Sequence, residues 1–151
     1  METANGYQLV LKSHIGPVSL GMKKEDLRKI MSGNVEVEEA YIDMELGGMA
    51  INASDYFEET GIKVEYDSGG LVIFIEIGDF VPVWFESVSL FELNFREIFT
   101  FFRKHDRQFR SDESGFNSEK LGVAVYAPEH EDDPKCKIEL ISIFIDGYMD
   151  E

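Results

Sequence analysis

The clearest pattern of apolar and polar positions lies in residues 61–77. Apolar and charged residues alternate from Ile62 to Asp67, which is the period of a strand with one solvent-facing side. Gly69 and Gly70 follow, and they accept the positive φ angles that a tight turn needs. Residues 71–77 are then largely apolar on both sides. The stretch therefore predicts a β-hairpin whose second strand lies in the middle of a sheet.

Two stretches have the helical period. The first covers residues 21–31, with Leu27, Ile30 and Met31 on one side, and Gly33 ends it. The second begins after Asn94, which has the capping-box spacing to a glutamate three residues on. Its apolar stripe consists of Phe95, Ile98, Phe99 and Phe102. Both stripes predict core-facing helices.

Other segments are shorter or less regular. Strands are expected at residues 7–11, 18–20, 35–43, 80–85, 121–126 and 138–145. Charges in 35–43 indicate an exposed or edge strand. Residues 44–53 predict a loop or weak strand, and Ser54 can cap a helical turn over 55–60. In the polar stretch 103–118 we predict neither a helix nor a strand.

The two halves of the chain echo each other. Val18-Ser19-Leu20 recurs as Val88-Ser89-Leu90, and Ile73-Phe74-Ile75 recurs as Ile143-Phe144-Ile145, both 70 positions later. Each half would be a strand, a helix and a hairpin, at about residues 16–78 and 86–148. The chain is therefore expected to form one α+β domain over residues 1–151, a mostly antiparallel sheet with two main helices on one face.

The segment from Gly16 to Gly33, with Leu20-Gly21-Met22 before an amphipathic helix, resembles the opening of the repeat units in β-lactamase-inhibitor-like folds. It is similar to small bacterial immunity proteins and to uncharacterised bacterial cytoplasmic proteins built in this way. The resemblance covers less than half of the chain. It implies a protein-binding role without catalysis, and it supplies no residues that can be carried over.

The net charge bears most strongly on which partners the protein is expected to bind. The chain has 14 Lys and Arg against 30 Asp and Glu, a net charge of −16. Such a surface repels phosphate backbones and anionic lipid, so we expect no direct nucleic-acid or membrane binding. It attracts basic proteins instead. Cys136 is the single cysteine, which excludes an internal disulfide and, with no leader or membrane-spanning run in the sequence, indicates a cytoplasmic protein.

Candidate chemistry is sparse. His14, His105 and His130 fall in separate elements without the spacing of metal ligands. The acidic loop 129–133 lacks the ligand alternation and central glycine of a calcium loop. We expect neither a cofactor nor a metal, and the sequence favours a non-catalytic protein.

The leading hypothesis is an acidic protein-binding module, in its concrete form an immunity-type protein that neutralises a basic partner such as a nuclease toxin. Aromatic anchors and flanking acids are the expected partner-binding residues. They are Tyr41, Asp43, Glu45, Tyr56, Glu58, Glu59, Trp84, Glu129, Glu131, Asp132, Asp133 and Tyr148. Two alternatives remain: a small-ligand binder or enzyme with a cleft between the halves, and a module that homodimerises through the face of Val81, Val83 and Phe85.

Overall fold

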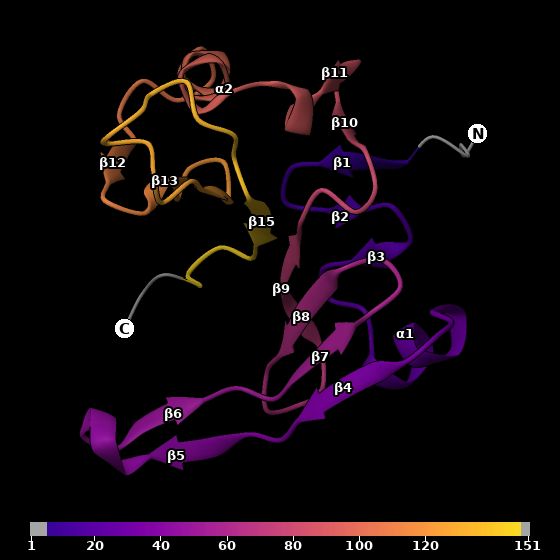
Figure 1. Ribbon diagram of the computed structural model, residues 1–151. Coiled ribbons are helices and arrows are strands. Elements are labelled where there is room, and N and C mark those ends of the chain that lie inside the picture. The colour runs from indigo at the N-terminus through magenta and orange to yellow at the C-terminus, as the bar shows by residue number, and fades with distance from the viewer. Residues whose placement is uncertain (1–5, 149–151) are drawn as a thin grey trace.

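An eight-stranded antiparallel sheet forms the centre of the computed structural model, which describes residues 6–148 (Figure 1). Its strands lie in the order β12 (Arg110–Asp112), β13 (Gly115–Ser118), β14 (Val123–Tyr126), β15 (Leu140–Phe144), β9 (Val72–Ile77), β8 (Ile62–Tyr66), β7 (Ser54–Phe57) and β4 (Val35–Glu38). Four strands come from before residue 78 and four from after residue 109, and β9 meets β15 in the middle.

The hairpin expected at residues 61–77 is confirmed as β8 and β9. The Asp67 carboxylate accepts hydrogen bonds from the N–H groups of Gly69 (2.9 Å) and Leu71 (3.0 Å), and Gly70 has φ 81°. The other side of β9 pairs with β15, where Ile75 faces Ile143, and both side chains are fully buried. The second strand of the hairpin is therefore central, as its apolar character predicts.

A second, five-stranded sheet is smaller and mixed. Its order is β11 (Val88–Ser89), β10 (Val83–Phe85), β1 (Tyr7–Val10), β2 (His14–Ile15) and β3 (Val18–Ser19). β1 and β10 are parallel, and the other pairs in the described part of the chain are antiparallel. A 3₁₀ helix, η2 (Leu90–Glu92), connects this sheet to the second α-helix.

The first helix, α1, covers Lys24–Ile30 and is shorter than residues 21–31. Leu27 is its buried residue, and Ile30 is 52% exposed, so the expectation that Ile30 faces the core is wrong. The segment before the helix is used otherwise: Lys23 forms a β-bridge with Leu71, and the Lys24 N–H bonds the Gly70 carbonyl. The helix therefore has too few turns to present a full stripe.

The second helix, α2, covers Phe95–Arg103 and begins with the predicted capping box. The Asn94 side chain accepts from the Glu97 N–H (2.9 Å), and the Glu97 carboxylate accepts from the Asn94 N–H (3.0 Å). Phe95, Ile98 and Phe102 are buried, and Phe99 is half-buried. The stripe is core, as its spacing indicates.

Both helices contact the same side of the eight-stranded sheet. Directly paired residues on neighbouring strands lie on the same face of a sheet. From strand to strand, Asp55 therefore shares its face with Val64, with Ile75 and Ile143 of the central pair, and with Phe116 on β13. Asp55 bonds Arg28 of α1. Phe116 packs against Phe95 of α2 with ring centroids 6.0 Å apart.

One expectation for a short segment is wrong, and two strands lie where the sequence predicted no element. Residues 54–57 form strand β7 and not a helical turn, because Asp55 and Phe57 point to the buried face and pair with β8. The polar stretch 103–118 contains strands β12 and β13. Gly115 (φ 151°) permits β13 to pair with β14, since a Cβ there would collide with the Val125 carbonyl.

The chain between β4 and β7 leaves the body of the molecule. Strands β5 (Tyr41–Asp43) and β6 (Met49–Ile51) pair only with each other among the described residues, and the 3₁₀ helix η1 (Met44–Leu46) lies at their tip. This hairpin extends away from the sheet at its β4 end (Figure 1). Within residues 6–148 as a whole, no helix is long and apolar enough to cross a membrane.

Candidate functional site

The hairpin of residues 41–51, which we name the arm, carries apolar side chains that are not covered by the rest of the described chain. Met44, at the tip, is 77% exposed, and Ile42 is 57% exposed. The other large exposed apolar residues of the arm are Tyr41, Leu46 and Met49. An exposed apolar cluster of this kind on a protein surface is typical of an interaction site.

The charged residues in the sequence segment that carries the arm are all acidic. Between Lys29 and Lys63 the sequence has no Lys, Arg or His. It has eight acids there: Glu36, Glu38, Glu39, Asp43, Glu45, Asp55, Glu58 and Glu59. All except Asp55 and Asp43 are exposed. The segment that carries the arm therefore has negative charge and no cation of its own, while Lys63 of β8 lines the groove beside the arm. Glu59 lies at the end of β7 away from the arm, where it accepts a hydrogen bond from Ser32.

Local backbone bonds give the arm tip its shape. The Asp43 carboxylate accepts from the Glu45 N–H (3.0 Å) and caps η1, and the Gly48 N–H bonds the Asp43 carbonyl (3.0 Å). Gly47 and Gly48 have φ 76° and 86°, angles that favour glycine. The turn can thus be closed without apolar packing, which leaves Met44 and Leu46 facing solvent.

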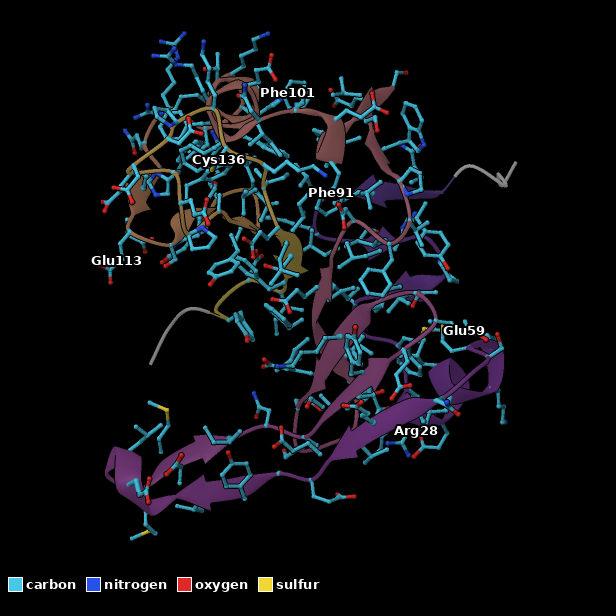
Figure 2. All side chains as sticks on the ribbon, in the orientation of Figure 1. Arg28, Glu59, Phe91, Phe101, Glu113 and Cys136 are labelled. Carbon is cyan, nitrogen blue, oxygen red and sulfur yellow. The ribbon has the colours of Figure 1, made fainter. Side chains whose placement is uncertain are left out.

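A buried ion pair anchors the base of the arm to helix α1. Asp55 of β7 is fully buried, and it accepts two hydrogen bonds of 2.7 Å from Arg28 and one of 2.6 Å from the Tyr66 hydroxyl. Figure 2 shows Arg28 beside β4, at this end of the sheet. Burial opposes ionisation of Asp55, but the Arg28 and Tyr66 hydrogen bonds outweigh it and lower its pKa. The carboxylate is therefore ionised and fixes the position of β7.

A groove of about 580 Å³ separates the arm from the solvent-facing side of the sheet. Its walls include Met49 and Ile51 of the arm and Glu65 of β8. The Tyr148 hydroxyl, also at the groove, donates to Glu65 (2.7 Å), and its ring stacks on Phe74 with centroids 5.1 Å apart. Burial and the Glu65 carboxylate raise the pKa of Tyr148, so the phenol stays protonated as a donor.

The structure brings together part of the predicted binding set. Tyr41, Asp43 and Glu45 lie on the arm itself. Tyr56, Glu58 and Glu59 belong to β7 and the turn after it, and Tyr56 faces Glu36 across the β4–β7 pair. Tyr148 lines the groove beneath the arm.

The remaining predicted residues lie elsewhere. The acidic residues of loop 129–133 are Glu129, Glu131, Asp132 and Asp133. That loop lies beside α2, since the Arg96 N–H bonds the Pro134 carbonyl, and α2 packs on the β13 side of the sheet. Trp84 lies on β10 of the smaller sheet, half-buried. These residues therefore do not form one surface with the arm.

The groups that could carry chemistry are engaged in packing. His130 stacks on Phe95 (ring centroids 4.2 Å apart) and bonds the Asp112 carbonyl. Burial and the neighbouring Asp133 and Glu129 raise the pKa of Cys136, which lowers the thiolate fraction that a nucleophile needs. Within residues 6–148, no group of three or more His, Cys, Asp or Glu is arranged to hold a metal ion.

No protein-family model, curated protein or solved structure matches the chain.

The sequence interpretation missed the apolar half of the arm. Ile42, Met44, Leu46 and Met49 were assigned to an edge strand and a loop or weak strand, and none was chosen as a contact residue. A signal was present, because these apolar residues occur within the long segment that lacks any basic residue. Local apolar content and charge have to be considered together to find the arm.

Proposed function

We propose that this protein is a non-catalytic acidic binding module that docks a basic protein on its arm and on the neighbouring strands β4 and β7. The concrete form of the proposal is an immunity-type protein that neutralises a basic partner such as a nuclease toxin. The observation that carries it is the arm, where exposed apolar side chains lie among acids with no nearby base in the sequence.

The two properties have different roles in binding. Acids around the arm speed the encounter with a basic protein and bias it toward this end of the molecule. Tyr41, Ile42 and Met44 supply apolar area that a partner can desolvate, which slows dissociation. Binding of a second copy is disfavoured, because it would bring two such negative surfaces together.

The test compares two variants with the same net charge. An arm-neutral variant carries Glu36→Gln, Glu38→Gln, Asp43→Asn and Glu45→Gln. A loop-neutral control carries Glu129→Gln, Glu131→Gln, Asp132→Asn and Asp133→Asn. The wild type and both variants are immobilised and offered purified basic nucleases at low salt and at roughly 0.5 M, where screening is short-ranged.

We expect the wild type and the loop-neutral control to retain a basic nuclease at low salt, more weakly at high salt, and the arm-neutral variant to lose it. An equal loss in both variants would mean that binding follows net charge and not the arm. Retention by all three proteins, independent of salt, would contradict an electrostatic partner.

One observation supports the alternative of a small-ligand site. A depression of about 350 Å³ on the solvent-facing side of the sheet is lined by residues from both halves, among them Glu76, Asn117, Tyr126 and Ser142. It lies above the β9–β15 pair and not in a cleft through it, since Ile75 and Ile143 beneath are fully buried. Equilibrium dialysis of the wild type and Tyr126→Ala against a library of small cations would detect such a ligand.

The structure is unfavourable for the homodimer face suggested by the sequence. Val83 and Phe85 are buried within the chain, and Phe85 stacks on Phe102 of α2 with centroids 5.5 Å apart. Two of the three residues of that face are therefore packed inside the chain.

We also propose that the chain is built from two pseudo-repeats, at about residues 16–78 and 86–148. The strand order supports this, because β4, β7, β8 and β9 on one side of the sheet correspond to β12, β13, β14 and β15 on the other. Phe74 and Phe144, which are 70 positions apart in sequence, face each other in the central pair. A short strand and a helix precede each set of strands.

A further inference from the structure

Strand β4 is one edge of the eight-stranded sheet, and its outer side has no neighbour among residues 6–148. In an antiparallel pair, alternate residues direct their N–H and C=O groups toward the partner strand. The Glu58 N–H donates to the Asn34 carbonyl (3.0 Å), so every second residue counted from Asn34 directs its backbone groups toward β7. Glu36 and Glu38 therefore bond inward to β7, while the backbone groups of Val35 and Val37 point outward.

The side chains of β4 follow the same alternation. Val35 and Val37 lie on one face, 38% and 49% exposed, and Glu36 and Glu38 lie on the other. Glu36 is close to Glu58, and the hydrogen bond and charge repulsion between the two carboxyls raise the pKa of Glu36. An incoming cation would relieve that repulsion, whereas another carboxylate would increase it.

We infer that an extended segment of the partner adds to β4 as a further strand, with basic side chains beside Glu36 and Glu38 and apolar side chains beside Val35 and Val37. This rests on the proposed function, and it specifies the kind of segment that is recognised, one in which basic and apolar residues alternate. Main-chain bonds to Val35 and Val37 supply affinity, and the alternation supplies register.

A second copy of the chain is a poor occupant of this edge. Pairing β4 with itself would place Glu36 and Glu38 against the same two residues of the other copy, and like charges across a strand pair are destabilising. The acids thus act against self-pairing at an otherwise open edge and leave it available to a basic strand.

Two labelled peptides of identical composition test this inference, with fluorescence anisotropy as the measurement. In one, Lys and Val alternate; in the other, all Lys residues precede all Val residues. Both are used below the concentration at which either self-associates. Strand addition predicts that the alternating peptide binds about tenfold more tightly, because one register satisfies charge and apolar contacts together.

Variants at Val37 test the backbone contact directly. Val37→Pro removes an N–H that points outward, so β4 should still pair with β7, while the bond to the peptide is lost. Val37→Ala is the matched control, since it trims the side chain and keeps the N–H. We expect about tenfold weaker binding of the alternating peptide to Val37→Pro and less than about threefold to Val37→Ala. Far-UV circular dichroism and thermal melting check that both variants are folded.

Equal affinity for the two peptides, no binding of either, or full binding by Val37→Pro would each overturn strand addition. Strand addition by a partner would also be overturned if the protein self-associates without peptide and Val37→Pro abolishes this, because a second copy would then occupy the edge. These results do not decide the proposed function, which depends on whether a folded basic nuclease is lost from the arm-neutral variant and retained by the loop-neutral control.

Discussion

Arg28 and Asp55 form a two-point ion pair, with both N–O distances 2.7 Å and the Asp55 side chain fully buried. Removing one partner of a buried pair leaves an uncompensated charge. We expect Arg28→Ala to lower the free energy of unfolding by about 2 kcal/mol, less than for a fully buried pair because the Arg28 side chain is 37% exposed. The exposed Lys29→Ala, on the same helix, should change it by less than about 0.5 kcal/mol in urea denaturation at pH 7.

The contribution of the Arg28–Asp55 pair to the free energy of unfolding depends on pH. Burial acts against the Asp55 carboxylate, but Arg28 and Tyr66 outweigh it, so the pKa of Asp55 is lower in the folded state. Its stabilising contribution is present above the unfolded pKa of about 3.9 and is lost as the pH falls through the folded value. The difference between the wild type and Arg28→Ala should therefore shrink in urea titrations at decreasing pH. A difference that is constant down to acid pH would contradict this assignment.

Glu76 is predicted to be a destabilising carboxylate at neutral pH. Burial is the main cause of its raised pKa, Glu65 adds to it, and Lys63 across the strand opposes it. The charged form is disfavoured in the fold, so Glu76→Gln should raise the melting temperature at pH 7 and lose that advantage at low pH, where the acid is protonated in both states. Glu119→Gln, which removes the same charge from an exposed site, is the control. An equal gain in both variants would point to net charge alone.

The arm is expected to be dispensable for folding. Tyr41 faces Ile51 across the β5–β6 pair, so residues 42–50 can be replaced by Asn-Gly, a two-residue hairpin turn. Because the removed apolar side chains are exposed, the free energy of unfolding should stay within about 1 kcal/mol of the wild type. Binding of a basic nuclease should be lost. A broad, non-cooperative unfolding transition would show instead that the arm is part of the folded core.

The capping box of α2 offers a local test of helix stability. Asn94→Ala removes the bond to the Glu97 N–H and should cost about 1 kcal/mol in chemical denaturation. Asn94→Ser, which keeps an oxygen acceptor at this position, should recover most of the loss. If alanine and serine behave alike, the cap does not contribute as the geometry indicates.

Much of the fold follows from local sequence signals. Alternation and turn glycines predicted β8 and β9, and Asn94 with Glu97 predicted the start of α2. The α+β class was also predicted correctly, and of the exposed or edge strand predicted at 35–43, residues 35–38 form the edge strand β4. These features depend on residues near each other in sequence, so the sequence alone carries enough information to find them.

The features that were missed lack a clear local pattern. Asp55 appeared to belong to a capped turn because its ion-pair partner, Arg28, is 27 positions away in sequence. The β12–β13 hairpin was missed because its turn, between Asp112 and Gly115, lies in a mostly polar stretch without a clear alternation of apolar residues. Of the candidate site, Tyr41, Asp43 and Glu45 were predicted, but the exposure of Met44 and Leu46 depends on the arm leaving the sheet, which the alternation of apolar and polar residues does not show.

The β9–β15 pair has a consequence for how the protein is made. Strands β4, β7, β8 and β9 are complete once Ile77 leaves the ribosome, whereas β15 begins only at Leu140. Until then the nascent chain exposes an apolar strand, β9, along one open side, where it can pair with other chains. The β5–β6 pair of the arm and the β4 edge, by contrast, are formed by residues before Ile77, and only the groove beneath the arm is completed later, by Tyr148. The binding end of the sheet can therefore form early in synthesis, and the interval before β15 emerges is the one in which a chaperone would matter most.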